Sequence, residues 1–289
     1  MGIFLGSEIE QPQEDQALFH IVPVPYEHSV SYGSGTSLGP AAIIEASDQL
    51  ETTDGVSEPC NEGIYTHPAI DCSGDPEAIM QRIRSVNGKI AARKQIPVVL
   101  GGEHTVSYGA VMGVADAYPE QKIGIVQFDA HADLRDSYEG SKWSHASVMK
   151  RLVDEGMSLF QLGVRAMSVE EQAVRDAHSD RIHYLDARCL CRQNPTHSMT
   201  LPEDFPELIY ITVDIDGLDG AIMPATGTPV PGGLSYWQMI DLLESVIGQR
   251  QVVGMDVVEL APIDGFHVYD YTTAEVVYKM MGLVSRARD

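Results

Sequence analysis

Three stretches decide the fold expected of this chain of 289 residues: IPVVLGGEH at residues 96–104, IGIVQFDAHAD at residues 123–133 and IYITVDID at residues 209–216. Each stretch begins with a short apolar run and ends in a cluster of polar residues. Such runs are typical of strands that are buried on both faces, as in parallel sheets. Because open α/β sheets place their ligand sites at the carboxyl ends of the strands, we expect the three polar clusters to meet in one crevice.

Short apolar runs and helical patterns alternate along the rest of the chain. Residues 75–94 show the apolar periodicity of a helix, and a last helix is expected over residues 272–288. The alternation predicts an α/β fold of three layers, α/β/α, around a central, mainly parallel sheet of about eight strands. No linker divides the chain, so residues 1–289 are expected to form a single domain, with residues 1–17 as a surface or mobile lead-in.

Composition limits the classes of function. The chain is 44% hydrophobic and 21% charged, as globular proteins are, but its net charge is −23. This acidity argues against nucleic-acid or membrane partners and favours a small cationic substrate, with solubility or adaptation to salt as the alternative explanation. The four cysteines form no Cys-x-x-Cys pair, the amino terminus lacks the pattern of a signal peptide, and no apolar stretch approaches the ~20 residues of a membrane span. We therefore expect a cytoplasmic protein with reduced thiols.

Candidate metal ligands gather in the three polar clusters. They are His104, Asp129, His131, Asp133, Asp214 and Asp216. In an extended chain, Asp129, His131 and Asp133 point to the same face. Four carboxylates in one crevice would repel one another, and two divalent cations would neutralise them. A ligand set of imidazole and carboxylate without thiolate suits Mn²⁺ and related ions, and a pair of such ions is a site for metal-assisted hydrolysis.

Each cluster taken alone has a simpler explanation. An aspartate at a strand end commonly caps the next helix. Gly101 and Gly102 are compatible with a phosphate-binding loop, although no Lys-Ser/Thr pair follows them. The spacing of Asp214, Asp216 and Asp219 superficially suggests a calcium loop, but the terminal glutamate of such a loop is missing. The occurrence of three similar clusters favours a shared metal site.

Four motifs resemble the signature segments of the ureohydrolases, the arginase and agmatinase family. They are GGEH at 101–104, DAHAD at 129–133, SHAS at 144–147 and DID at 214–216. The resemblance runs from about Tyr26 to the carboxyl terminus, and PATGTPVPGGL at 224–234 is most similar to the agmatinase branch. It implies an arginase-like fold and a homo-oligomer, either a trimer or a hexamer.

The resemblance also implies a centre of two Mn²⁺ ions per subunit, although other divalent ions remain open. Asp129 and Asp214 would bridge the two ions. The first ion would be held by His104, Asp129, Asp133 and Asp214, and the second by Asp129, His131, Asp214 and Asp216.

Three side chains take the catalytic roles that the resemblance implies. A hydroxide between the metal ions would attack the guanidinium carbon, and Asp133 would orient it and pass a proton to the leaving amine. His145 corresponds to a histidine that shuttles protons or contacts the substrate. Glu259 corresponds to a carboxylate that binds the guanidinium group, which suits a carboxylate because its planar fork allows paired hydrogen bonds.

The function we expect is hydrolysis of agmatine to urea and putrescine, a reaction of polyamine biosynthesis. Arginases carry an Asn-bearing segment after the Asp-x-His-x-Asp motif, where this chain has Leu134-Arg135-Asp136, so the resemblance does not extend to arginine recognition. Arg135 would either bind a substrate carboxylate, as in guanidinobutyrate, or pair with Asp136 or Glu139. Guanidinobutyrase, aminopropylagmatine ureohydrolase, arginase and an inactive metal-binding paralogue are the alternatives.

Overall fold

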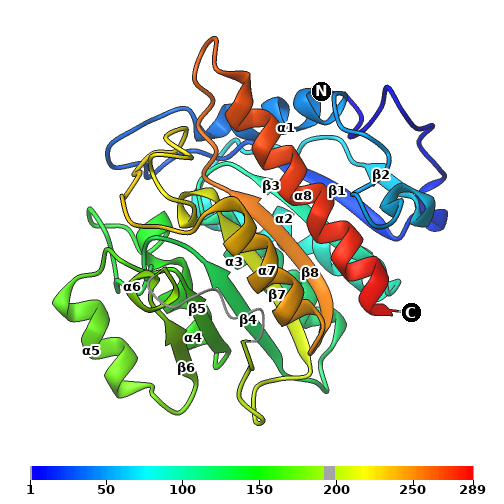
Figure 1. Ribbon diagram of the computed structural model, residues 1–289. Helices are drawn as coiled ribbons and strands as arrows, with labels where there is room; N and C mark the ends of the chain where they lie inside the picture. Colours follow the sequence, from blue (N-terminus) through cyan, green and yellow to red (C-terminus); the bar gives the residue numbers. More distant parts are fainter. Residues whose placement is uncertain (1, 192–198, 289) are drawn as a thin grey trace.

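One parallel sheet runs through the molecule (Figure 1), whose computed structural model describes residues 2–191 and 199–288. In chain order its strands are β1 (Phe19–Val24), β2 (Ile64–Thr66), β3 (Ile96–Gly101), β4 (Ile123–Phe128), β5 (Ser158–Leu162), β6 (Ile182–Leu185), β7 (Leu208–Asp214) and β8 (Gln251–Val258). The strand order in this 8-stranded sheet is β2-β1-β3-β8-β7-β4-β5-β6. Every pair of neighbouring strands is parallel.

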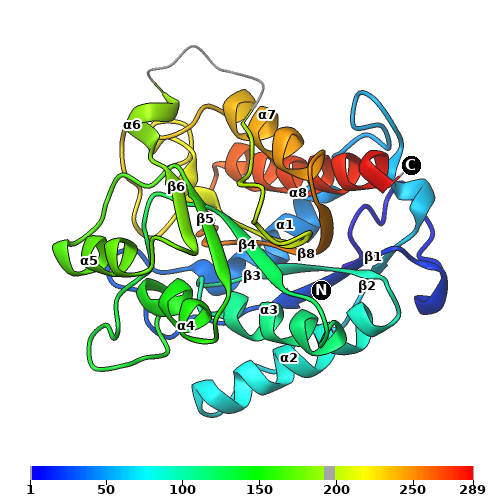
Figure 2. The ribbon, with the colours of Figure 1, turned by 90° about the horizontal axis from the view of Figure 1, so that it is seen from below.

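Helices cover both faces of the sheet. They are α1 (Gly39–Ser47), α2 (Pro76–Ala92), α3 (Val106–Ala117), α4 (Val148–Asp154), α5 (Val169–Ala177), α6 (Ala187–Leu190), α7 (Tyr236–Ile247) and α8 (His267–Arg288). Figure 2 shows α2, α3 and α4 on one side of the sheet and α1, α7 and α8 on the other. A separate apolar core fills the space between the sheet and the helices on each side. The predicted three-layer fold with a central sheet is therefore confirmed.

Of the two helices predicted with limits, one agrees with the structure and the other begins earlier than expected. The helix predicted over residues 75–94 is α2, whose first turn is capped by the Asp75 side chain. The last helix, α8, begins at His267, so the start predicted at residue 272 was wrong. Its first turns leave Val268 and Tyr271 exposed, and for that reason no inward apolar stripe marks them in the sequence.

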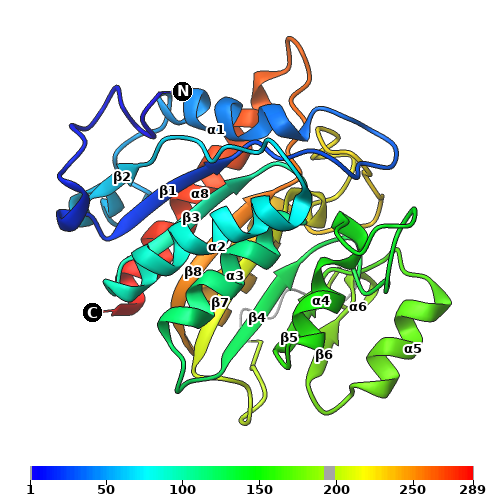
Figure 3. The same ribbon diagram turned by 180° about the vertical axis from the view of Figure 1, so that it is seen from behind.

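The amino-terminal segment is fixed to the domain. Phe4 and Leu5 are fully buried. The Phe4 N–H donates to Thr66 Oγ1 at 3.0 Å, and the Leu5 N–H donates to Ser47 Oγ at 2.8 Å. These contacts hold the segment against β2 and α1, which places it on the surface of the sheet edge (Figure 3).

Two expectations drawn from composition can be compared with the structure. Within residues 2–191 and 199–288, no helix has both the length and the apolar character that a membrane span requires. The cysteines are all unpaired, as predicted, and they are Cys60, Cys72, Cys189 and Cys191.

The four central strands position the polar clusters. In the sheet they follow the order β3, β8, β7, β4, and they all run in the same direction. His104 lies just after β3, Asp129 just after β4, Asp214 at the end of β7 and Glu259 just after β8. Because parallel strands end at one edge, side chains that are up to 155 residues apart come together there.

Candidate metal centre

His104 faces three carboxylates at the carboxyl edge of the sheet. Its Nδ1 lies 3.1 Å from Asp129 Oδ2, 3.0 Å from Asp133 Oδ2 and 3.5 Å from Asp214 Oδ2. All these side chains are buried. His104, Asp129 and Asp214 therefore form one group whose ligand atoms could surround a single ion.

A second group lies beside the first and shares Asp129 with it. His131 Nδ1 is 3.0 Å from Asp216 Oδ2 and 3.5 Å from Asp129 Oδ1. The two oxygens of Asp129 thus face different histidines, which is the arrangement that a bridging carboxylate requires. The structure brings all six predicted ligands into this one cluster.

The hydrogen bonds of His104 test whether a cation fits. The Thr212 hydroxyl donates to Asp256 Oδ1 at 2.6 Å, so its oxygen is free to accept from His104 Nε2, which lies at 2.9 Å. In the neutral ring Nε2 then carries the proton, and Nδ1 points a lone pair at three carboxylates. Nδ1 is buried and has no hydrogen-bond partner. A divalent cation between Nδ1 and the carboxylates would give the Nδ1 lone pair and the carboxylate oxygens a common partner. The residues therefore fit a metal.

The charges of the cluster lead to the same conclusion. Burial, together with the neighbouring Asp129, raises the pKa of Asp133 to about 7. Burial, Asp216 and Asp129 raise the pKa of Asp214 well above its usual range. For His131, burial opposes the charged form, but Asp216 and Asp129 outweigh it and raise the pKa to about 12. Asp133 and Asp214 are thus shifted towards their neutral forms, and added positive charge would keep them ionised.

Two of the predicted catalytic residues have left-handed backbone conformations. The φ angle is 54° at Asp133 and 66° at Glu259. Residues other than glycine adopt such angles at a cost of about 1 kcal/mol or more, and they do so mainly where the surrounding structure imposes them. The Lys150 N–H holds the Asp133 carbonyl at 3.1 Å, and the Glu259 N–H donates to the Gly102 carbonyl at 2.8 Å. The strained turns direct both carboxylates into the cluster.

Glu259 lies next to the first histidine. Its Oε1 accepts the His104 backbone N–H at 2.7 Å, and the side chain is buried. Burial and the nearby Glu103 raise the pKa of Glu259 well above its usual range. A cationic partner would therefore be needed to hold this carboxylate in its charged form.

Gly102 allows the loop after β1 to approach the site. A Cβ atom at this position would lie 2.0 Å from the Tyr26 carbonyl oxygen, so only glycine fits. The carboxylate of Glu103 then accepts the backbone N–H groups of His28 and Ser29, at 2.5 and 2.6 Å. The loop that follows Tyr26 is thereby fixed over the end of β3.

His145 is held by the same loop. The Ser29 hydroxyl donates to Glu103 Oε1 at 2.7 Å, and its oxygen lies 3.1 Å from both the backbone N and the ring Nδ1 of His145. Because the hydroxyl proton is committed to Glu103, the oxygen accepts from Nδ1–H, which leaves Nε2 of the neutral ring without a proton. Burial lowers the pKa of His145 and so favours this neutral form.

A cavity of about 330 Å³ opens beside the cluster. Its wall includes His131, Asp133 and His145 of the predicted site, whereas Glu259 is not among the lining residues. The other lining residues are Ser31, Arg135, Tyr138, Ala146, Ala166, Met167, Ser168, Glu171 and Thr228. Residues from the segments that follow β1, β4, β5 and β7 therefore surround one opening at the metal-ligand cluster.

The wall contains one ion pair that the sequence did not indicate. Arg135 Nε is 3.8 Å from Glu171 Oε2, and its guanidinium carbon lies 5.4 Å from the centre of the Tyr138 ring. Asp136, which was one predicted partner, instead accepts from Arg151 at 2.7 Å. The prediction that Arg135 pairs with Asp136 or Glu139 was wrong because α5 carries Glu171 to the cavity wall.

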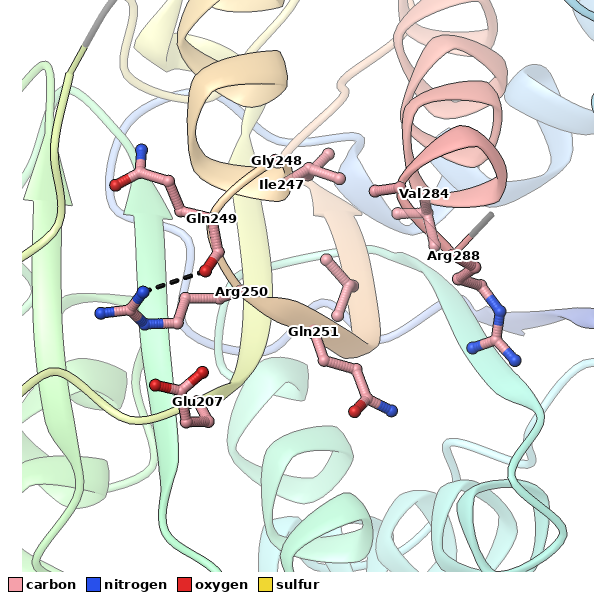
Figure 4. Close-up of a pocket in the computed structure, with 10 residues that line it drawn as sticks. Glu207, Ile247, Gly248, Gln249, Arg250, Gln251, Val284 and Arg288 are labelled. Atoms are coloured by element: carbon pink, nitrogen blue, oxygen red, sulfur yellow. Dashed lines mark hydrogen bonds between the residues drawn. The ribbon is translucent and has the colours of Figure 1, made fainter.

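A larger cavity, of about 500 Å³, lies away from the cluster at the amino-terminal end of β8 (Figure 4). Gln249 and Arg250 from the turn before β8 line it, as do Gln251, the first residue of β8, and Arg288 at the end of α8. None of the predicted site residues contributes to this cavity. The chemistry is therefore assigned to the smaller cavity.

Several residues of the site were not found from the sequence. Thr212 and Asp256 support His104, and Ser29 and Glu103 support His145. Two of these residues could have been identified from the sequence, because each is a polar residue inside an otherwise apolar strand. Thr212 lies in β7 and Asp256 in β8. Buried polar groups in such positions need partners, and these partners point to the site.

Asp219, which the sequence left outside the site, lies apart from the two ligand groups. Its Oδ1 accepts the Ala221 N–H at 2.9 Å, and its Oδ2 accepts the Gly232 and Gly233 N–H groups at 2.5 and 2.9 Å. It therefore closes the loop after β7 and supplies no ligand atom to the cluster.

The chain is similar to known proteins in sequence and in fold. The Arginase family profile matches residues 17–282. The chain is 35% identical to an N(1)-aminopropylagmatine ureohydrolase of Synechocystis sp., over 96% of this chain and 92% of the relative. It is 37% identical to an N(1)-aminopropylagmatine ureohydrolase of Thermus thermophilus, over 96% and 93% of the two chains. The solved structure of the agmatine ureohydrolase of Thermoplasma volcanium is similar with a TM-score of 0.86 and 25% identity, covering 99% of this chain and 95% of that one.

Proposed function

This chain belongs to the arginase family, and on that premise we propose that it hydrolyses agmatine or a closely related amine-bearing guanidine to urea and an amine. The observation that carries the proposal is the pair of His–Asp groups joined by Asp129, together with the Nδ1 atom of His104, which lies within 3.5 Å of three carboxylates. Acyl or phosphoryl transfer without a metal would not require this arrangement.

The cluster would hold two Mn²⁺ ions. The ligand set is His104, Asp129, Asp133 and Asp214 for one ion and Asp129, His131, Asp214 and Asp216 for the other. A set of carboxylates and imidazoles without thiolates is the kind that Mn²⁺ accepts. When bound, such ions lower the pKa of a coordinated water towards neutrality and so supply a nucleophile.

The side chains around the ions would bind the substrate and move protons. Glu259 is buried and accepts one backbone N–H at Oε1, and its Oε2 would pair with the guanidinium group. His145 lines the cavity with Nε2 free, and this atom would exchange a proton with the leaving amine. Asp133 lies between the first group and the cavity and would orient the attacking water.

The choice of substrate tail has two candidates. Agmatine fits an acidic protein and is what the sequence predicted. Hydrolysis of N(1)-aminopropylagmatine is the second candidate, and it is favoured by the names of the relatives from Synechocystis and Thermus. Both substrates carry a cationic tail, which Glu171 on the cavity wall would accommodate.

Release of urea tests the proposal directly. Purified protein, stripped of metal and then loaded with Mn²⁺, would be given agmatine, N(1)-aminopropylagmatine, arginine and guanidinobutyrate in parallel. We expect urea from one or both amine-tailed substrates only after Mn²⁺ is added. No urea from any of the four guanidines, in protein that retains Mn²⁺, would favour the inactive metal-binding paralogue.

Arg135 is expected to weaken the binding of a cationic tail. Its guanidinium group is partly exposed and lies on the cavity wall, so it repels an ammonium group and occupies Glu171. The substitution Arg135→Met should raise kcat/KM for the amine-tailed substrates up to about fivefold, which is the range of partly exposed charge pairs. The same change should lower kcat/KM for guanidinobutyrate. Steady-state kinetics on the four guanidines measure both effects.

Arg151→Met serves as the control for Arg135, because Arg151 pairs with Asp136 and does not line the cavity. We expect the control to leave the ratio between substrates unchanged. A loss of activity on amine-tailed substrates in Arg135→Met would show that Arg135 helps to bind them.

His145→Ala is expected to lower kcat by about 10²-fold, the usual contribution of a general acid or base. The reason is the loss of the free Nε2 that Ser29 orients towards the cavity. Added imidazole should restore part of the rate, and the metal content, measured by atomic absorption, should not change. Loss of bound metal in parallel with activity would instead assign His145 a structural role.

A further inference from the structure

A chain of buried side-chain hydrogen bonds leads from α5 to one of the proposed metal ligands. Arg175 Nε donates to Gln161 Oε1 at 2.8 Å, Gln161 Nε2 donates to Gln127 Oε1 at 2.6 Å, and Gln127 Nε2 donates to Asp129 Oδ2 at 2.7 Å. All four residues are buried, with at most 1% of their surface exposed. The chain thus connects a buried cation to a carboxylate that both ligand groups share.

The direction of every hydrogen bond in the chain is fixed by its two ends. Arg175 can only donate, because a guanidinium group has no acceptor and stays charged. Gln161 must therefore turn its oxygen towards Arg175 and its nitrogen towards Gln127. Gln127 must then turn its oxygen to Gln161 and its nitrogen to Asp129, which as an ionised ligand can only accept. The amide dipoles point the same way, so each bond strengthens the next.

The same chain of hydrogen bonds also holds the backbone of the DAHAD motif. The second N–H of Gln161 donates to the Ala132 carbonyl at 2.8 Å, and Gln127 Nε2 lies 3.4 Å from the His131 carbonyl. Two further contacts hold Arg175 in place. Its Nη1 donates to Asp186 Oδ1 at 3.0 Å, and its guanidinium carbon lies 4.2 Å from the centre of the Tyr184 ring.

Packing alone does not explain these side chains. Gln127 of β4 and Gln161 of β5 are direct partners in the sheet register, on a face where Ile125 and Leu159 join the apolar core. Burying two amides and a guanidinium group there costs free energy that apolar residues of the same size would not. Polar groups in such a place point to a role in orienting what they contact.

We propose that Arg175, Gln161 and Gln127 form a positioning relay that fixes the orientation of the Asp129 carboxylate and thereby sets the affinity of the protein for its metal ions. The inference rests on the proposed metal centre. It assigns the three residues no contact with the substrate, since none of them lines the cavity beside the cluster.

The test measures Mn²⁺ binding to the metal-free protein by competition with a fluorescent chelator, in the absence of substrate. Gln127→Met removes the donor to Asp129 at nearly constant volume, and we expect it to weaken Mn²⁺ binding about 10- to 100-fold. Arg175→Met should weaken binding by a smaller factor, about fivefold, because it acts through two amides. In the double variant the Arg175→Met change should add nothing further, since the relay is already broken at Gln127.

Gln95→Met is the matched control. Gln95 is also a buried glutamine, and its Nε2 donates to the carbonyls of Glu14 and Ala17, away from the metal-ligand cluster. We expect it to lower the stability in urea unfolding without changing Mn²⁺ affinity. Gln127→Met and Arg175→Met should change both quantities, and Arg175→Met carries the test alone if Gln127→Met does not fold.

Three outcomes separate the possibilities. Unchanged Mn²⁺ affinity in folded Arg175→Met and Gln127→Met would overturn the relay while leaving the proposed function intact. Fully additive losses in the double variant would also overturn it, because independent packing effects add. A wild-type protein that binds no Mn²⁺ would overturn the proposed metal centre and the relay together.

Discussion

Replacing Asp129 by alanine is expected to strip the protein of metal and to lower kcat/KM by about 10³-fold or more. Asp129 belongs to both His–Asp groups, and its two oxygens face His104 and His131 separately. Its loss removes one of the negative charges that balance the cations. Metal ions stabilise the charge of such transition states by several kcal/mol, and each 1.36 kcal/mol is a factor of ten in rate.

The metal content of the purified variant and its urea release with excess Mn²⁺ measure these two effects. Asp136→Ala is the control, since this aspartate lies close to the motif in sequence but its side chain is 84% exposed and pairs with Arg151. We expect the control to keep its metal and its activity. Full activity in Asp129→Ala would refute the assignment of Asp129 as a bridging ligand.

Glu259→Gln is expected to lower kcat/KM by about 10³-fold while the protein keeps its metal. The change preserves the shape and the acceptor for the His104 N–H, but it removes the negative charge that would bind the guanidinium group. Truncating one side of a buried charged pair costs about 2–5 kcal/mol, and 4 kcal/mol corresponds to this loss in rate.

The same variant separates substrate binding from metal binding. Equilibrium Mn²⁺ affinity should change little, because Glu259 supplies no ligand atom to either group. Guanidine hydrochloride at low concentration should inhibit the wild type by occupying the Glu259 site and should inhibit Glu259→Gln less. If the variant loses metal and activity in equal measure, Glu259 supports the metal centre and does not bind the guanidinium group.

Several predictions from the sequence stay predictions. They concern the limits of a single domain, the identity of the metal, the assembly into a homo-oligomer, the location in the cytoplasm and the absence of nucleic-acid and membrane partners. The missing signal-peptide pattern motivates the predicted location, and the strongly negative net charge of −23 motivates the predicted absence of nucleic-acid and membrane partners.

The sequence alone predicted the layered fold, which the structure confirms, and the residues of the candidate metal cluster, which the structure brings together. Each ligand lies within a few residues of a strand end, so local patterns identify it. His104, Asp129 and Asp214 lie at the ends of short apolar runs, which are typical of strands that are buried on both faces of a sheet. Parallel strands then bring these ends to one edge, whichever order the strands take.

Only the tertiary structure decided how these residues are oriented and supported. The last strand, β8, lies between β3 and β7, and this order alone places Asp256 beside Thr212 and Glu259 beside His104. The relay from Arg175 likewise depends on the place of α5 in the fold, which brings Arg175 within hydrogen-bond distance of Gln161 in β5. Hydrogen-bond partners from distant segments leave no periodic pattern in a sequence, because their spacing is set by strand order and helix packing and not by the repeat of any one element.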